Sequence, residues 1–178
     1  DWLDTRYRKR NQSLSMLLEL LMESSAQRSG NYLVFFPSYA YLKQVHEAFA
    51  VQYPDIETWC QSPAQNKDEQ QQLLKHLESP GHRIGFAILG GVFGEGIDYV
   101  GDLLIGVIIV GTGLPGLNVQ TQLVAEHYRN SGQNGFDFAY RYPGFTRVLQ
   151  TAGRLIRHEL DKGIVILVDD RFKQSFYK

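Results

Sequence analysis

Two arginines three positions apart carry the clearest chemical signal in this 178-residue chain. We expect Arg154 and Arg157 to share one face of a helix from Phe145 to His158, because side chains three residues apart are neighbours on a helix. The forked guanidinium group matches phosphate oxygens, and two such groups suit a triphosphate. The alternative is a solvated helix face on which both arginines pair with carboxylates, and spacing alone favours neither interpretation.

A glycine-rich loop at residues 90–101 is the second signal, and it follows a buried apolar run at 83–89. Glycines permit positive φ angles and leave backbone N–H groups accessible to an anion. A simple turn would use the same residues. The spacing G-x-x-G-x-G differs from the dinucleotide pattern G-x-G-x-x-G, we expect no helix after it, and the sequence contains no P-loop pattern.

Ser38 is a third candidate, because it follows the apolar run 32–36 and precedes a helix predicted to reach Val51. Its simplest role is to cap that helix. Alternatively, its hydroxyl and the free N–H groups of the first helical turn hold a phosphate. We expect Cys60 to be part of a strand core.

Composition narrows the class of protein. Eighteen Lys and Arg against nineteen Asp and Glu give a net charge of −1, which neither indicates nor excludes a nucleic-acid partner. The single cysteine excludes an internal disulfide framework and a cysteine-rich zinc or iron–sulfur site within this chain. Apolar runs are far shorter than the ~20 residues that span a bilayer, so we expect no membrane association.

The elements that must position these residues alternate between strand and helix. Such a pattern predicts an α/β fold with a parallel sheet, helices on both faces, and functional loops at the carboxyl ends of the strands. Residues 1–12 are polar and basic and predict an exposed linker. The predicted strands are 32–36, 56–60, 83–89, 104–110 and 163–168, and the predicted helices are 13–27 (capped by Ser13), 37–51, 67–77, 118–130 and 145–158.

In this order, the motifs resemble the second motor domain of superfamily 2 helicases, most closely the XPD/DinG family of DNA helicases. The resemblance spans about residues 30–172. It rests on Phe35–Tyr39 (motif IV), Gly94–Asp98 (motif V, E-G-I-D), Gln150–Arg157 (motif VI, Q-x-x-G-R-x-x-R), Gly113–Pro115 (a strand followed by L-P) and Asp169–Phe172 (D-x-R-F).

The resemblance implies a RecA-like domain, a P-loop NTPase fold without its own P-loop. Arg154 and Arg157 would then be arginine fingers for the γ-phosphate of ATP, and Gln150 would sense that phosphate. Gly96, Asp98 and Gly153 would lie at the nucleotide. The residues that would contact the backbone of single-stranded DNA are Ser38, Tyr39, Gly91, Phe93 and Gly94.

The resemblance also implies a larger protein. Residues 1–12 would link a missing N-terminal motor domain to this second domain at 13–178. The missing domain would hold most of the ATP and Mg²⁺ site and any iron–sulfur cluster, so the isolated fragment is expected to be inactive. The whole would be a monomeric, 5′-to-3′ helicase of the bacterial cytoplasm. The alternative is a non-catalytic RecA-like module that binds nucleic acid or a protein.

Overall fold

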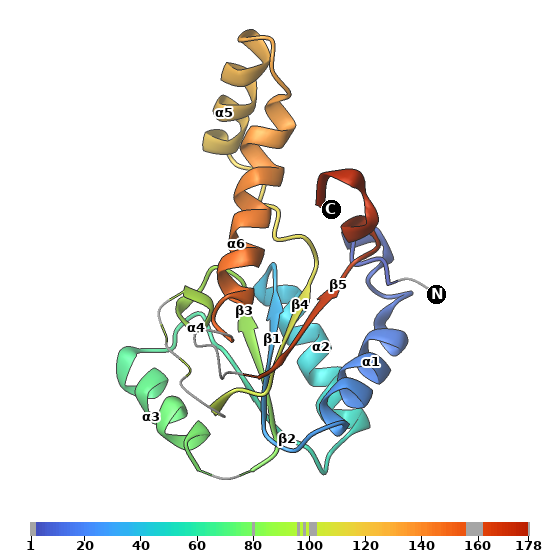
Figure 1. The fold of residues 1–178 in the computed structure, drawn as a ribbon, viewed down its shortest axis with the longest axis vertical. Coiled ribbons are helices and arrows are strands. Elements are labelled where there is room, and N and C mark those ends of the chain that lie inside the picture. Colours follow the sequence, from blue (N-terminus) through green and yellow to red (C-terminus); the bar gives the residue numbers. More distant parts are fainter. Residues whose placement is uncertain are drawn as a thin grey trace.

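A five-stranded parallel sheet forms the centre of the computed structural model, which describes residues 3–79, 81–95, 97, 99, 103–155 and 162–177. The strand order is β2-β3-β1-β4-β5, and every neighbouring pair is parallel (Figure 1). The predicted sheet is therefore confirmed, with each strand within about two residues of its expected range. The strands are β1 (Asn31–Phe36), β2 (Glu57–Cys60), β3 (Arg83–Ile88), β4 (Gly106–Val110) and β5 (Ile164–Val168).

Helices pack against both faces of the central strands. All six residues of β1 are buried, which explains its continuous apolar run: a parallel strand between two helical layers has no solvent face. Two hydrophobic clusters, one on each face of the sheet, make up most of the core. On one face lie α1 (Leu14–Ala26) and α2 (Tyr39–Gln52), and on the other lie α3 (Lys67–Leu77), α4 (Val92–Glu95) and α6 (Tyr142–Ala152).

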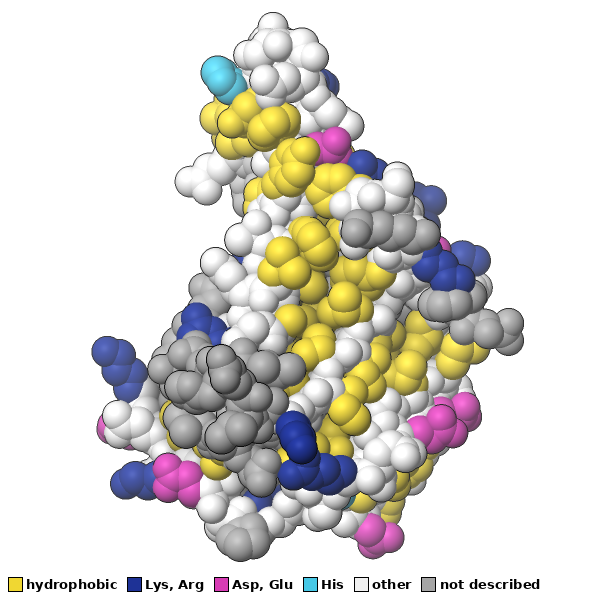
Figure 2. All heavy atoms as spheres, viewed as in Figure 1, with side chains coloured by type: hydrophobic (Ala, Val, Ile, Leu, Met, Phe, Trp, Pro, Cys, Tyr) yellow, Lys and Arg dark blue, Asp and Glu magenta, His cyan; other side chains and the backbone are white. Residues whose placement is uncertain are grey.

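Strand β5 departs from the predicted two-sided burial. It lies at the edge of the sheet, and Val165 and Leu167 are 37% and 42% exposed. Ile166 and Val168 point the other way, into the cluster beneath α1 and α2. Figure 2 shows the hydrophobic side chains that reach the surface on this side of the molecule. The prediction of helices on both faces of the sheet is therefore confirmed for the central strands and wrong for β5.

A helical hairpin projects beyond the sheet (Figure 1). Helix α5 (Val119–Asn130) matches the predicted helix 118–130, and Asn118 caps it. A π-helical turn at Asp137–Arg141 then leads into α6. Pro143 has no N–H to donate, so the regular series of α-helical hydrogen bonds is interrupted at this position. No helix of the described residues is long and apolar enough to cross a membrane.

The predicted helix 145–158 is wrong at both ends. Helix α6 begins at Tyr142 and ends at Ala152, with Gly153 as its C-cap. The chain continues in a tighter turn, where the N–H groups of Arg154 and Leu155 donate to carbonyls three residues back. Leu155 is buried in the core, so the chain turns inward after the helix ends.

The N-terminal segment packs against the domain, so the expectation of an exposed lead-in is wrong for part of it. Leu3 and Thr5 are buried, and the Leu3 carbonyl accepts a hydrogen bond from Asp170 N at 2.9 Å. Ser13 precedes α1 but makes no capping bond, because its hydroxyl donates to the Asp4 carbonyl at 2.9 Å. Whether this segment links two domains remains a prediction.

Candidate functional site

The glycine-rich loop after β3 folds differently from its prediction. Gly90 has a φ of 77°, which turns the chain out of the strand, and the short helix α4 follows at once. This short helix lies inside the G-x-x-G-x-G pattern at 91–96, so it interrupts the expected loop but does not contradict the expectation that no helix follows the pattern. Phe93 of α4 is fully buried with its ring 5.1 Å from that of Trp59. Because this side chain is part of the core, a contact of Phe93 with DNA would have to use its backbone, and that contact stays a prediction.

Helix α4 packs against the end of α6 through Gly94. A Cβ atom at Gly94 would lie 3.1 Å from Thr151 Oγ1 and 3.4 Å from Phe35 Cε1. Thr151 is fully buried, and its hydroxyl has no hydrogen-bond partner among the described residues. The glycine-rich loop and the Gln150–Arg154 segment, which are far apart in sequence, therefore form one packed unit.

Gly153, which the sequence placed at the nucleotide, makes no comparable close contact among the described residues. A Cβ atom at Gly153 would meet only carbonyls of its own helix, Leu149 O at 3.3 Å and Gln150 O at 3.7 Å. Gly153 itself is exposed. Within the described part of the domain, no other segment of backbone uses the space that this glycine leaves.

Tyr99 connects the two halves of this unit. Its hydroxyl donates to the Phe93 carbonyl at 3.1 Å. Burial raises the pKa of Tyr99 far above its usual value, and the nearby charge of Arg154 opposes that rise. Arg154 is half-buried after α6, and Gln150 is exposed on α6. The other predicted nucleotide residues, Arg157, Gly96 and Asp98, lie outside the described residues.

The proposed DNA-contacting residues lie at the carboxyl ends of β1 and β3. Ser38 caps α2, since its Oγ accepts a hydrogen bond from Tyr41 N at 3.4 Å, which confirms the simpler prediction. Tyr39 is 37% exposed. Gly91 is half-buried in the loop after β3, while Gly94 is buried against α6.

Gln61 ties these loops together, and the sequence reading missed it. It is buried; its Oε1 accepts from Ile88 N at 2.9 Å, and its Nε2 donates to the Tyr39 hydroxyl at 3.5 Å. A Cβ atom at Gly91 would lie 3.5 Å from the same amide. The available signal was position: Gln61 is the polar residue directly after β2, where functional loops of a parallel sheet begin.

The D-x-R-F segment forms a clamp on the N-terminal segment. Arg171 donates to both carboxylate oxygens of Asp169, at 2.6 and 2.8 Å, and Thr5 donates from its hydroxyl and its N–H. Burial opposes ionisation of Asp169, but these hydrogen bonds outweigh it and lower its pKa to about 2. We name this group, Thr5 with Asp169 and Arg171, the Asp169 clamp.

Three carboxylates near the clamp stand close enough to hold a metal ion: Asp4, Asp169 and Asp170. Arginine already neutralises each of them. Arg6 Nη1 lies 2.9 Å from Asp4 and 3.0 Å from Asp170, and Arg171 holds Asp169. The cluster therefore does not fit a Mg²⁺ site.

Filling the space at Gly94 tests the contact between α4 and α6. We expect Gly94→Val to lower the free energy of unfolding by about 1–3 kcal/mol, because its methyl groups would press on Thr151 and Phe35. Gly116→Val is the matched control, since a Cβ there meets nothing within 4 Å. Urea denaturation measures both. Equal stability of the two variants would contradict the packing described.

A family model described as the helicase C-terminal domain matches residues 21–178. The ATP-dependent DNA helicase CHL1 of Candida albicans is 30% identical over 96% of this chain and 23% of its own length. The probable ATP-dependent helicase MJ0942 of Methanocaldococcus jannaschii is 29% identical over 97% of this chain and 28% of its own. The chain thus spans about a quarter of the length of these curated relatives.

A solved structure of an XPD helicase superposes with a TM-score of 0.79 and 22% identity, over 99% of this chain and 31% of that one. At this level of identity the likeness concerns the fold. It confirms the predicted RecA-like α/β architecture. The roles of individual residues are a separate question.

Proposed function

The chain belongs to the helicase C-terminal domain family of XPD-like helicases, and from that premise we propose that it is the second motor domain of an ATP-dependent DNA helicase. The observation that carries the proposal is the contact of Gly94 with Thr151. Through it, the loop after β3 and the segment that carries Gln150 and Arg154 become one unit. A motor needs such a unit, because a change at the nucleotide must reach the DNA.

ATP lies between two domains in this proposal, and the missing domain supplies the P-loop and the Mg²⁺ ligands. This domain contributes hydrogen-bond donors to the phosphates of ATP from Gln150, Arg154 and Arg157. Beside the nucleotide lie Gly96, Asp98 and Gly153. Gln150 is exposed and Arg154 half-buried, so both are accessible to a partner domain. Phosphoryl transfer depends on positioning and on stabilisation of charge, and arginines delivered by a second domain make hydrolysis depend on domain closure.

In this proposal, single-stranded DNA runs along the loops at the carboxyl ends of β1 and β3. Tyr39 offers an exposed ring, with Ser38 and the Gly91 loop beside it, and Gln61 fixes the distance between them. Contacts with the sugar–phosphate backbone and with base faces do not depend on sequence, as a translocating motor requires. The 5′-to-3′ direction of movement is part of the proposal, by analogy with the family.

Replacing Tyr39 tests the DNA side. In the full-length protein, Tyr39→Ala is expected to weaken single-strand binding about 5- to 100-fold, the range for losing one ring on which a base stacks. Val51→Ala is the control, because Val51 is an exposed apolar side chain at the far end of the same helix. Fluorescence anisotropy measures binding.

The same preparation tests the function as a whole. Single-stranded DNA should stimulate ATP hydrolysis by the wild-type full-length protein, and a strand-displacement assay with 5′ and 3′ overhangs reads the polarity. Binding without any ATP hydrolysis would overturn the motor assignment in favour of a non-catalytic binding module. Equal affinities of Tyr39→Ala and Val51→Ala would remove Tyr39 from the DNA path.

A further inference from the structure

A pocket of about 250 Å³ lies beside the Asp169 clamp, at the carboxyl ends of β1 and β4. Arg6, Arg10 and Arg171 line it, and none of its lining residues is acidic. The carboxylates that pair with Arg6 and Arg171 stand outside the pocket. The cavity is thus lined by three arginines and by no carboxylate of the described residues.

Arg10 differs from the other two arginines. Its Nε donates to the Thr5 carbonyl at 3.2 Å, and its guanidinium lies 4.1 Å from the ring centroid of Tyr41. No carboxylate of the described residues pairs with it. Burial lowers the pKa of Arg10 below its usual value, but an arginine remains charged at neutral pH. A half-buried cation without a carboxylate partner therefore faces the pocket, and a charge in such a place favours an anion.

Thr112 adds a neutral donor to the same wall. It is 1% exposed, and its Oγ1 has no hydrogen-bond partner among the described residues. Gly111 and Gly113 on either side have φ angles of 88° and 70°, and a Cβ at Gly113 would lie 2.6 Å from Gly144 O. The loop is therefore held in conformations that favour glycine. A buried hydroxyl such as that of Thr112 costs stability when it is left unpaired, unless a ligand oxygen meets it.

We propose that this pocket binds one backbone phosphate of the single strand, with Arg10 supplying the charge and Thr112 the hydroxyl. The pocket is smaller than the usual range of roughly 300–1,000 Å³ for small-molecule sites, so it suits a phosphate better than a whole nucleotide. Its wall includes Pro37, the neighbour of Ser38 and Tyr39, which makes it continuous with the proposed DNA path. The inference rests on the proposed function.

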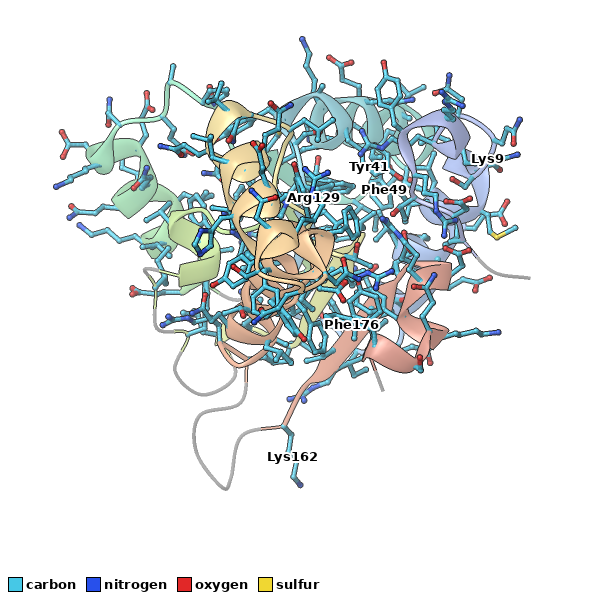
Figure 3. All side chains as sticks on the ribbon, turned by 90° about the horizontal axis from the view of Figure 1, so that it is seen from above. Lys9, Tyr41, Phe49, Arg129, Lys162 and Phe176 are labelled. Carbon is cyan, nitrogen blue, oxygen red and sulfur yellow. The ribbon has the colours of Figure 1, made fainter. Side chains whose placement is uncertain are left out.

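The N-terminal segment gains a role by this assignment, because it brings Arg10 to the pocket. Figure 3 looks down on the molecule and shows Lys9 of this segment and Tyr41 of α2 on the same side. Arg10 follows Lys9 and stacks on Tyr41. The segment 1–12, which was predicted only to connect two domains, would thus also bind the single-stranded DNA.

Removing the charge of Arg10 is the first test, in the full-length protein. Arg10→Gln is expected to weaken single-strand binding about 10-fold and to reduce the slope of log K against log salt by about 0.7, the amount for one phosphate contact. Arg8→Gln removes a neighbouring charge that does not line the pocket, and it should leave the slope near that of the wild type. Anisotropy titrations across salt concentrations measure both.

Oligonucleotides with a single neutral methylphosphonate locate the contact. In the wild type one position of the substitution should lower affinity, and in Arg10→Gln that same position should lose its effect. Thr112→Val keeps the side-chain shape, so it should weaken binding while leaving the melting temperature close to that of the wild type. If Arg10→Gln fails to fold, Thr112→Val still tests whether the pocket binds a phosphate of the DNA.

The outcomes separate the two proposals. A wild-type protein that does not bind single strands refutes the proposed function. Wild-type binding with equal salt slopes for Arg10→Gln and Arg8→Gln, or with unchanged affinity for Thr112→Val, refutes the pocket alone. Inorganic phosphate that raises the melting temperature of the wild type but not of Arg10→Gln, with no sensitive methylphosphonate position, would assign the pocket to free phosphate instead and overturn the DNA contact.

Discussion

Replacing Arg157 with alanine in the full-length protein is expected to lower DNA-stimulated ATP turnover by a factor on the order of 10³, the effect of losing an arginine finger. ATP binding should fall much less, because the finger acts mainly on charge that develops in the transition state. Arg157→Lys should restore little, since an ammonium group cannot reproduce the forked contact of a guanidinium. Unwinding should decrease together with turnover, because both depend on the same domain closure.

A nucleotide-binding titration and a melting curve beside the ATPase assay make this result interpretable. Arg147→Ala is the matched control, because Arg147 is a half-buried arginine of α6 outside the Q-x-x-G-R-x-x-R pattern. It should keep turnover near the wild-type value. A folded Arg157→Ala protein with normal turnover would remove Arg157 from the mechanism. Lost turnover with an equally lowered melting temperature would assign Arg157 to the fold.

The strands were predictable because continuous apolar runs in the sequence indicate strands that are buried on both faces. A run such as Tyr32–Phe36 has no polar alternation, and a strand with two buried faces needs none. The same rule failed at β5, whose run Ile164–Val168 is equally apolar yet exposes one face. Periodicity records which side chains avoid water, and it cannot tell whether the cover comes from this domain or from elsewhere.

The candidate site was predictable only as separate local motifs. Glycine spacing marked the loop after β3, but it could not show that Phe93 turns inward or that Gly94 meets Thr151, since both depend on how α4 and α6 cross the sheet. Gln61 has no motif at all and gains its role from where β2 ends. The Asp169 clamp joins residues 164 positions apart, a pairing that no local pattern encodes.

Replacing Asp169 with asparagine is expected to cost about 3–5 kcal/mol of unfolding free energy, the usual effect of breaking one side of a buried ion pair. The carboxylate is fully buried and accepts hydrogen bonds from Arg171 and Thr5, so the change leaves the half-buried guanidinium of Arg171 without its counter-ion. Asp170→Asn is the control. Its side chain is 37% exposed in the pair with Arg6, and such pairs contribute at most about 1 kcal/mol.

The pH dependence of the unfolding free energy separates the contribution of the Asp169 charge from that of side-chain packing. Its pKa falls from 3.8 to about 2 on folding, so the stabilisation is fully present above pH 3.8 and is lost as the pH falls towards 2. That shift corresponds to about 2 kcal/mol. Urea denaturation of the wild type and Asp169→Asn at steps between pH 7 and pH 2.5 should therefore show a difference that shrinks with acidity. A difference that stays constant over this range would show that the clamp acts through packing and not through the ionised carboxylate.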